Sequence, residues 1–185
     1  MFQKLLSVLA LLGVLSACAP GGIVESGTRL DLVRDYRLAE MNFAALAGVT
    51  ISEENSLYPQ ADIVWHGDVP GDRIAQIGAL FDAAAARNMA GTINGLKPVT
   101  VDITLVRFHG LTRRAQFSTG GVYHIVFDMT LRDYRSGTVI EPARRIVANL
   151  EAWGGNANAQ LDAQGATEKV RVTGFLTDVL AEQLR

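Results

Sequence analysis

The sequence predicts an α+β domain in which an antiparallel or mixed sheet, with a long three-strand meander, is covered on one face by two helices. Two stretches, 98–105 and 122–133, alternate apolar and polar residues with the period of a half-buried strand. Two others, 73–89 and 172–184, place apolar residues three and four positions apart, as an amphipathic helix does. The expected order is therefore strand, short strand, helix, three strands and helix.

The N-terminal half of the domain supplies two strands and one helix. Residues 36–43 alternate moderately and form the first strand, with 49–52 as a short extension. The apolar run at 61–68, bounded by acidic residues and glycine, is the second and shorter strand. Asp72 is suited to cap a helix over 73–89. If the first strand pairs parallel with the meander, this helix is the crossover between them.

The meander and a final helix make up the C-terminal half. A long connection over 108–121 follows the strand that begins at Pro98, and residues 133–137 form a hairpin turn between the next two strands. The third strand covers 138–153, and the segment 156–185 is one amphipathic helix. The apolar stripe of that helix consists of Val172, Phe175, Leu176, Val179, Leu180 and Leu184.

The N-terminus carries a processing signal. The apolar run Leu5–Leu15 has about 11 residues, whereas a membrane span needs roughly 20. Small residues then precede Cys18, the single cysteine of the chain, and the order Leu-Ser-Ala-Cys resembles the bacterial lipobox. The resemblance implies a diacylglyceryl thioether on Cys18, cleavage before it, and acylation of the new amine by a chain such as palmitate. Two or more acyl chains anchor a protein stably.

These signals divide the chain into three parts. Residues 1–17 are a lipoprotein signal peptide, 18–27 a lipid-anchored tether, and 28–185 a single α+β domain. The expected location is the bacterial cell envelope, facing the periplasm, and Ala19 after the cysteine favours the outer membrane. With a formal net charge of −2, the chain has no bulk basicity that would indicate a nucleic-acid partner.

Several side chains near the predicted strand ends form a candidate binding surface. Both tryptophans lie beside glycine, where they are either buried core residues or the rim of an apolar groove. A basic pair in the long connection is either a solvated loop or a contact for lipid phosphates. The candidate residues are Trp65, His66, Asp68, His109, Arg113, Arg114 and Trp153.

The sequence contains no convergent catalytic set. Ser118 lacks the glycine-flanked elbow of a serine hydrolase, and the lipid would consume the cysteine. Asp102 and Asp128 are either a carboxylate pair across neighbouring strands or polar-face residues. The histidines, His124 included, show no cluster at ligand spacing, so no metal or cofactor is predicted.

Short blocks of the mature chain resemble a family of uncharacterised bacterial lipoproteins that is catalogued as a domain of unknown function. The blocks are Ala61–Asp68, Gly71–Arg73, Arg107–Thr112, Gly120–Val122 and Trp153–Gly155. A more distant similarity, carried by the helix, the meander with its Asp133–Gly137 turn and the C-terminal helix, is to auxiliary lipoproteins of envelope transport systems. The first resemblance implies no activity, and the second implies a module serving a transport complex.

We therefore expect a non-enzymatic, lipid-anchored periplasmic module that binds an envelope protein or lipid. The alternative is a periplasmic hydrolase or metal-dependent enzyme that uses His66, Asp68, His109 or His124. A structure separates the two, because the enzyme needs at least three of these side chains within about 5 Å of one another in a cleft.

Overall fold

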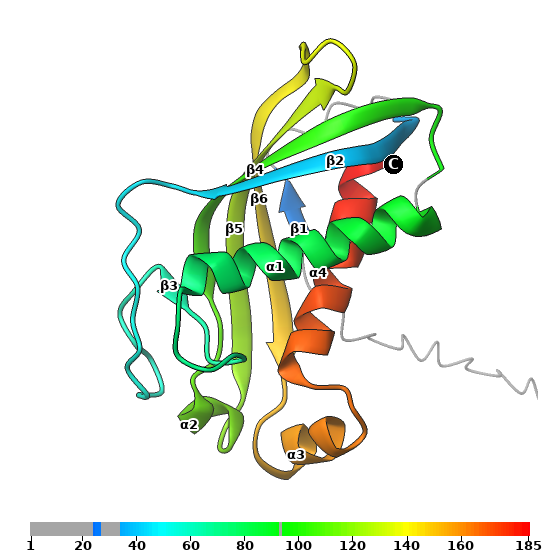
Figure 1. Cartoon of the computed structure of the whole chain (residues 1–185). Coiled ribbons are helices and arrows are strands. Elements are labelled where there is room, and N and C mark those ends of the chain that lie inside the picture. The colour runs from blue at the N-terminus through cyan, green and yellow to red at the C-terminus, as the bar shows by residue number, and fades with distance from the viewer. Residues whose placement is uncertain (1–23, 27–33, 93) are drawn as a thin grey trace, which may run out of the picture.

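A computed structural model of the chain describes residues 24–26, 34–92 and 94–185 (Figure 1). The leader, Cys18 and the first part of the predicted tether lie outside the described residues. The elements are β1 (Val24–Ser26), β2 (Tyr36–Ala45), β3 (Ile63–Val64), α1 (Arg73–Arg87), a kinked turn (Asn88–Thr92), β4 (Lys97–His109), α2 (Arg113–Gln116), β5 (Gly121–Asp133), β6 (Val139–Ala152), α3 (Gly155–Ala163) and α4 (Glu168–Leu184).

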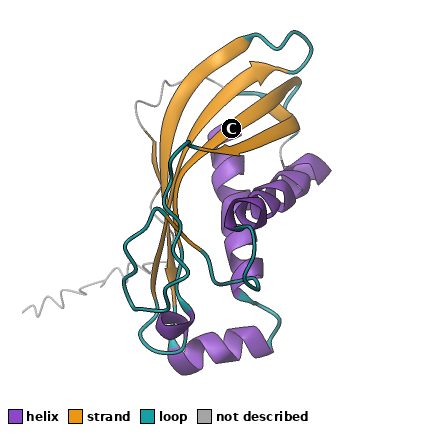
Figure 2. Ribbon diagram, turned by 60° about the vertical axis from the view of Figure 1, so that its left-hand side comes forward, coloured by secondary structure: helices purple, strands orange, loops and turns teal. Residues whose placement is uncertain are grey.

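The strands form one mixed sheet in the order β1-β6-β5-β4-β2, with β3 also paired to β4. β4, β5 and β6 are the predicted meander, and α1 and α4 lie together on one face of the curved sheet (Figure 2). The predicted fold class is therefore confirmed. We call the sheet face turned away from α1 and α4 the open face.

The core lies between the meander and the two long helices. Alternate residues of β4 and β5 point inward and are buried, as the period of two predicted. Aromatic side chains connect the layers, because Phe81 of α1 lies 5.2 Å from Phe43 of β2 and 5.4 Å from Phe127 of β5, measured between ring centroids. The inward residues of the two central strands are Val99, Val101, Ile103, Leu105, Phe108, Tyr123, Ile125, Phe127, Met129 and Leu131.

The crossover is also confirmed, because β2 pairs parallel with β4 and α1 lies between them in the chain. The Asp72 side chain accepts a hydrogen bond from the Ala75 amide at 3.0 Å, as expected of an N-cap. The helical path ends in the turn after α1, where Gly91 has a φ of 137°.

β4 runs further than predicted. A bulge between Leu105 and Arg107 inserts one residue, so that Phe108 returns to the inward face opposite Ile125. The alternation of apolar and polar residues stops at the bulge. For this reason the sequence pattern predicted that a loop begins there. The remaining connection holds α2, a single turn whose N-cap Thr112 accepts from the Ala115 amide at 3.2 Å.

The prediction of one C-terminal helix was wrong, because α3 and α4 are separate helices. Gly165 breaks the path with a φ of 79°, and the Thr167 side chain caps the new helix by accepting from the Val170 amide. The predicted apolar stripe belongs to α4 alone. Within the part of the chain that the structure describes, no helix is long and apolar enough to cross a membrane.

β1 falls inside the segment 18–27 that the sequence assigned to the tether. Its three residues pair antiparallel with β6, so the sheet begins within that segment. A strand this short has too few residues to show a period, and for this reason the sequence pattern did not reveal it.

A buried ion network fastens the residues before β2 to β6. The Arg34 guanidinium donates two hydrogen bonds to the Glu141 carboxylate, at 2.9 and 3.0 Å. The two side chains are only 4% and 7% exposed. Arg144, 3.7 Å from the same carboxylate, also donates to the main-chain carbonyl of Gln183 near the end of α4. The network thus joins three distant parts of the chain.

We predict that Glu141→Ala destabilises the fold by roughly 3 kcal/mol, because it leaves the buried Arg34 guanidinium without the carboxylate that it pairs with. The free energy of unfolding from chemical denaturation is the measurement. Asp128→Ala is the matched control, since its partner Arg145 is 55% exposed and such pairs contribute less than about 1 kcal/mol. Equal losses in the two variants would contradict a special role for the buried network.

Candidate functional site

The blocks that the sequence singled out meet at one end of the sheet. β3, β4 and β6 run in the same direction and finish there, and β5 begins there. We call this the loop end, and Figure 1 shows it at the bottom of the molecule with α2 and α3. Segments far apart in the sequence, 65–68, 109–114, 120–121 and 153–155, therefore lie at the same end.

Trp65 belongs to the core. Its side chain is fully buried, with its ring edge-on to Phe108 at 5.6 Å, and its indole nitrogen donates to the Asp68 carboxylate at 2.9 Å. A Cβ on Gly67 would lie 2.3 Å from the Trp65 ring, so only glycine allows the chain to fold back over the indole. The Trp65 side chain is therefore a buried aromatic of the core and does not line a groove at the surface.

Ion pairs hold the loop after β3 against the helices. Asp68 accepts from Lys169 of α4 at 2.8 Å. Burial opposes ionisation of Asp68, but the hydrogen bonds from Lys169 and Trp65 outweigh it and lower the pKa of the carboxyl. Arg73 of α1 pairs with the Glu53 carboxylate through two contacts of 2.6 Å and donates to the Val69 carbonyl at 3.1 Å. The contacts of Asp68 thus serve to hold this loop in place.

The three histidines do not converge. His66 is 9% exposed, burial lowers the pKa of its ring, and its Nε2 has no hydrogen-bond partner among the described residues. His109 and His124 are opposite each other on β4 and β5 but bond elsewhere, to the Pro59 carbonyl at 2.9 Å and to the Asn149 side chain at 2.7 Å. No three His, Cys, Asp or Glu side chains of the described residues form a metal-binding group. The metal-dependent alternative therefore has no group of ligands among the described residues.

The two aspartates of the open face do not form a carboxylate pair. Asp102 lies opposite Thr130, and Asp128 lies opposite Thr104. Each has its own arginine: Arg132 donates to Asp102 at 2.6 Å, and Arg145 to Asp128 at 2.9 Å. These side chains are the polar face of a half-exposed sheet, which was the simpler of the two expectations.

A buried carboxyl group that the sequence did not indicate lies behind the loop end. Glu168, the first residue of α4, accepts hydrogen bonds from the Tyr123 hydroxyl and, at 2.8 Å, from the Gln116 side chain. Burial raises the pKa of Glu168 to about 7, although these two bonds and the nearby Arg171 act in the opposite direction. The partners are 45 and 52 residues away in the chain, so no local pattern could have revealed the cluster.

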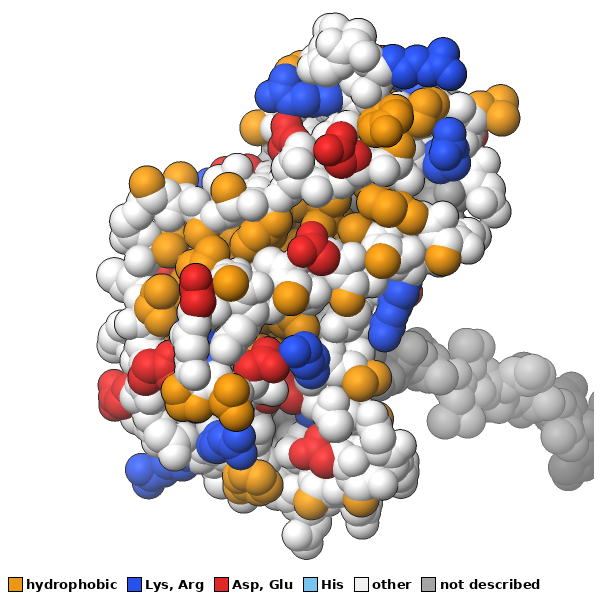
Figure 3. All heavy atoms as spheres, in the orientation of Figure 1, with side chains coloured by type: hydrophobic (Ala, Val, Ile, Leu, Met, Phe, Trp, Pro, Cys, Tyr) orange, Lys and Arg blue, Asp and Glu red, His pale blue; other side chains and the backbone are white. Residues whose placement is uncertain are grey.

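The surface of the loop end carries exposed apolar and basic side chains. Phe117, Val122 and Trp153 are 61%, 48% and 62% exposed. Arg113 and Arg114 of α2 are exposed as well. We call these five residues the aromatic–basic cap. Figure 3 shows hydrophobic and basic side chains side by side at this end.

The backbone beneath the cap is closely packed. A Cβ on Gly154 would lie 2.1 Å from the Gly120 amide nitrogen and 2.6 Å from the Ser118 carbonyl. Gly120 itself has a φ of 69°. Beside this contact is a groove of about 300 Å³, lined by Thr119, Gly121, Val122, Glu151, Ala152 and Trp153. The paired glycines thus bring the β5 start and the β6 end together and support Trp153 on the surface.

The protein thus has a mixed sheet that helices cover on one face. At its loop end, which is partly apolar, two glycines allow the strand ends to pack closely. The chain belongs to the family of unknown function DUF6778, whose sequence model matches residues 36–185. The resemblance to a family catalogued as a domain of unknown function is thereby confirmed. No curated protein matches the chain.

The chain is similar to solved structures at low sequence identity. A variant of the PelC dodecamer from Paraburkholderia phytofirmans is 12% identical, with a TM-score of 0.39 over 88% of this chain and 97% of that chain. The PelC dodecamer of the same organism is 12% identical, with a TM-score of 0.37 over 86% of this chain and 96% of that chain. A "putative lipoprotein" from Caulobacter crescentus CB15 is 12% identical, with a TM-score of 0.30 over 78% of this chain and 86% of that chain. The match to the family model, and not the similarity to a solved structure, therefore identifies the chain.

The Glu168 cluster predicts a pH dependence of stability. The folded carboxyl has a pKa of about 7 against an ordinary value of 4.5, so the folded chain binds more protons in this range than the unfolded chain. The free energy of unfolding therefore falls as the pH rises from 4.5 to 7. Glu168→Gln should flatten this fall and stabilise the protein at pH 8 by roughly 2–3 kcal/mol.

Chemical denaturation at pH 5 and pH 8 is the measurement. Glu182→Gln, on the exposed side of the same helix, is the control and should leave the pH profile unchanged. A Glu168→Gln protein that keeps the full pH dependence would show that another group causes it.

Proposed function

We propose that this protein is a non-enzymatic, lipid-anchored lipoprotein of the bacterial cell envelope, and that its domain rests on the bilayer through the loop end. In this proposal the lipid is attached to Cys18 and the domain faces the periplasm, with Ala19 favouring the outer membrane. The rest of the domain serves as a binding or assembly module, such as one serving a transport complex. The sequence Leu15–Cys18 and the aromatic–basic cap support different parts of the proposal.

The aromatic–basic cap is the observation that carries the proposed orientation. Tryptophan and other aromatic side chains are favoured at the boundary between lipid headgroups and acyl chains. Arginines near that boundary attract anionic headgroups with about 1 kcal/mol each. Trp153, Phe117 and the pair Arg113 and Arg114 supply both kinds of side chain at one end of the fold.

The direction of β1 agrees with this orientation. Val24 lies opposite Ala148 and Ser26 opposite Ile146, so the chain enters β1 from the side of the loop end. Cys18 precedes Val24 by six residues, which span at most about 20 Å. Trp153 follows Ala148 by five residues, about 17 Å along a strand. The lipid on Cys18 and the indole of Trp153 can therefore reach the same bilayer.

Fluorescence quenching tests the orientation. The lipidated protein is reconstituted into vesicles that contain brominated acyl chains, which quench only tryptophans close to them. We expect quenching of Trp153 and none of Trp65, because Trp65 is fully buried. Trp153→Phe should then remove the quenchable part of the emission while the Trp65 emission persists.

Two further results could overturn the proposal. Mass spectrometry of the native protein that finds an unmodified Cys18 thiol would remove the anchor. With the anchor present, equal emission in brominated and plain vesicles would refute the orientation alone. Arg113→Glu with Arg114→Glu should weaken quenching in anionic vesicles, whereas Arg37→Glu with Arg135→Glu, at the other end of the sheet, should not.

A further inference from the structure

The far side of the sheet presents a strand edge. β2 is the outermost strand on the side opposite β1, and its neighbour within the sheet is β4. No segment among the described residues hydrogen-bonds to the outer edge of β2. A ten-residue edge of this kind has main-chain donors and acceptors that a further strand can pair with.

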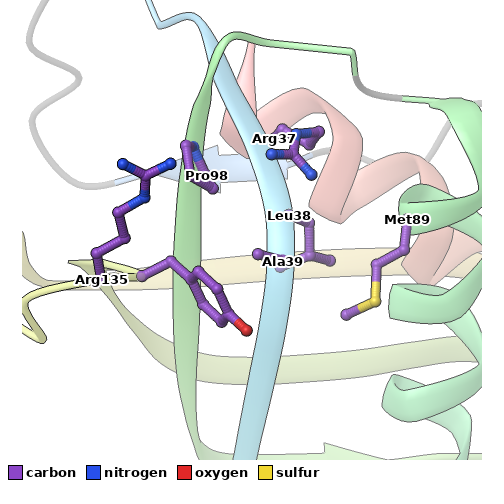
Figure 4. Close-up of a pocket in the computed structure, with 7 residues that line it drawn as sticks. Arg37, Leu38, Ala39, Met89, Pro98 and Arg135 are labelled. Carbon is purple, nitrogen blue, oxygen red and sulfur yellow. The ribbon is translucent and has the colours of Figure 1, made fainter.

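A groove lies at the start of this edge, at the end of the sheet opposite the loop end. It has a volume of about 350 Å³ and is lined by Arg37, Leu38, Ala39, Met89, Pro98, Tyr134 and Arg135. A bulge at Ala39 interrupts the pairing of β2 with β4 at this point. Figure 4 shows Arg37 and Ala39 on β2, Arg135 on the hairpin side of β4, and Met89 on the helix side of β2.

The groove combines apolar walls with two arginines. Tyr134 is 50% exposed and Met89 is 43% exposed. Figure 3 shows hydrophobic side chains between Lys and Arg side chains at this upper end. No carboxylate of the described residues forms an ion pair with Arg37 or Arg135. The groove is therefore both apolar and electropositive.

The acidic side chains closest in sequence are already engaged. Asp35 accepts from the Leu96 amide at 3.2 Å, and Glu40 accepts from the Thr100 hydroxyl at 3.3 Å. Asp133 accepts from the amide of Ser136 at 3.0 Å, inside the hairpin turn. An anionic group supplied from outside the chain would therefore complement the two arginines.

We propose that the outer edge of β2 and this groove bind an extended acidic segment of a partner protein by strand addition. Main-chain hydrogen bonds along β2 provide the pairing. An aspartate or glutamate of the segment pairs with Arg37 beside this edge, and an adjacent apolar side chain packs on Met89 on the helix side of β2. The inference goes beyond the proposed function and does not depend on the lipid anchor.

The main-chain edge favours a peptide over a lipid headgroup. A phosphate would use the two arginines but would leave the β2 amides and carbonyls unpaired. The groove also lies at the opposite end of the sheet from the aromatic–basic cap, so a peptide and a bilayer can occupy the protein together.

Binding of synthetic peptides tests the proposal. The lipidated protein in nanodiscs is titrated with a fluorescent nine-residue peptide that alternates valine with glutamate or aspartate, and anisotropy is recorded. We expect saturable binding that Arg37→Glu weakens at least tenfold. A peptide with lysine at the acidic positions should not bind, and Arg113→Glu with Arg114→Glu should leave the affinity unchanged.

Two controls examine the strand addition itself. N-methylation of alternate peptide amides should abolish binding in one register and spare it in the other, because only every second amide faces β2. Equal binding of both methylated peptides would refute strand addition. Displacement of the peptide by phosphatidylglycerol vesicles would make the groove a lipid site, and self-association of the protein through β2 would make a second copy the occupant; either result overturns the proposal. If the quenching experiment shows no contact between Trp153 and the bilayer, the strand-addition proposal is unaffected.

Discussion

Burial of one face of β4 and β5 beneath α1 and α4 is the interaction on which the rest of the structure depends. The inward side chains of the two strands are almost all fully buried, and Phe81 lies between the aromatic residues of β2 and β5. Burial of this apolar surface fixes the strand register, because a shift by one residue would turn the apolar row outward. With the register fixed, the strand ends and their side chains have defined positions.

The parts of the fold that could be predicted are those whose pattern is local and periodic. The β4 and β5 rows, the Asp72 cap and the Asp133–Gly137 turn each need only a short window of sequence. The bulge after Leu105 and the break at Gly165 interrupt a period, and at these two places the pattern predicted a loop too early and a helix too long. A sequence pattern indicates where a regular helix or strand lies, but it does not identify the single residue at which that element bends or ends.

The loop end was harder to predict, because depth decides the role of each side chain there. Trp65 and Trp153 both lie beside glycines, yet one is fully buried and the other is 62% exposed. The Tyr123 and Glu168 contact joins β5 to α4, and nothing near either residue indicates the partner. The candidate residues lie at one end of the sheet, but their contacts depend on tertiary packing that no short stretch of sequence reveals.

The network of Arg34, Glu141 and Arg144 has a consequence for how the chain reaches its folded state. Arg34 and Glu141 are 107 residues apart, so the N-terminal segment has no place to dock until β6 is available. Contacts at such separation make folding slow compared with a helical protein of the same size. The residues just before β2 are therefore among the last to reach their folded positions, and a chain cut short before β6 would leave Arg34 without Glu141 and β1 without the strand that it pairs with.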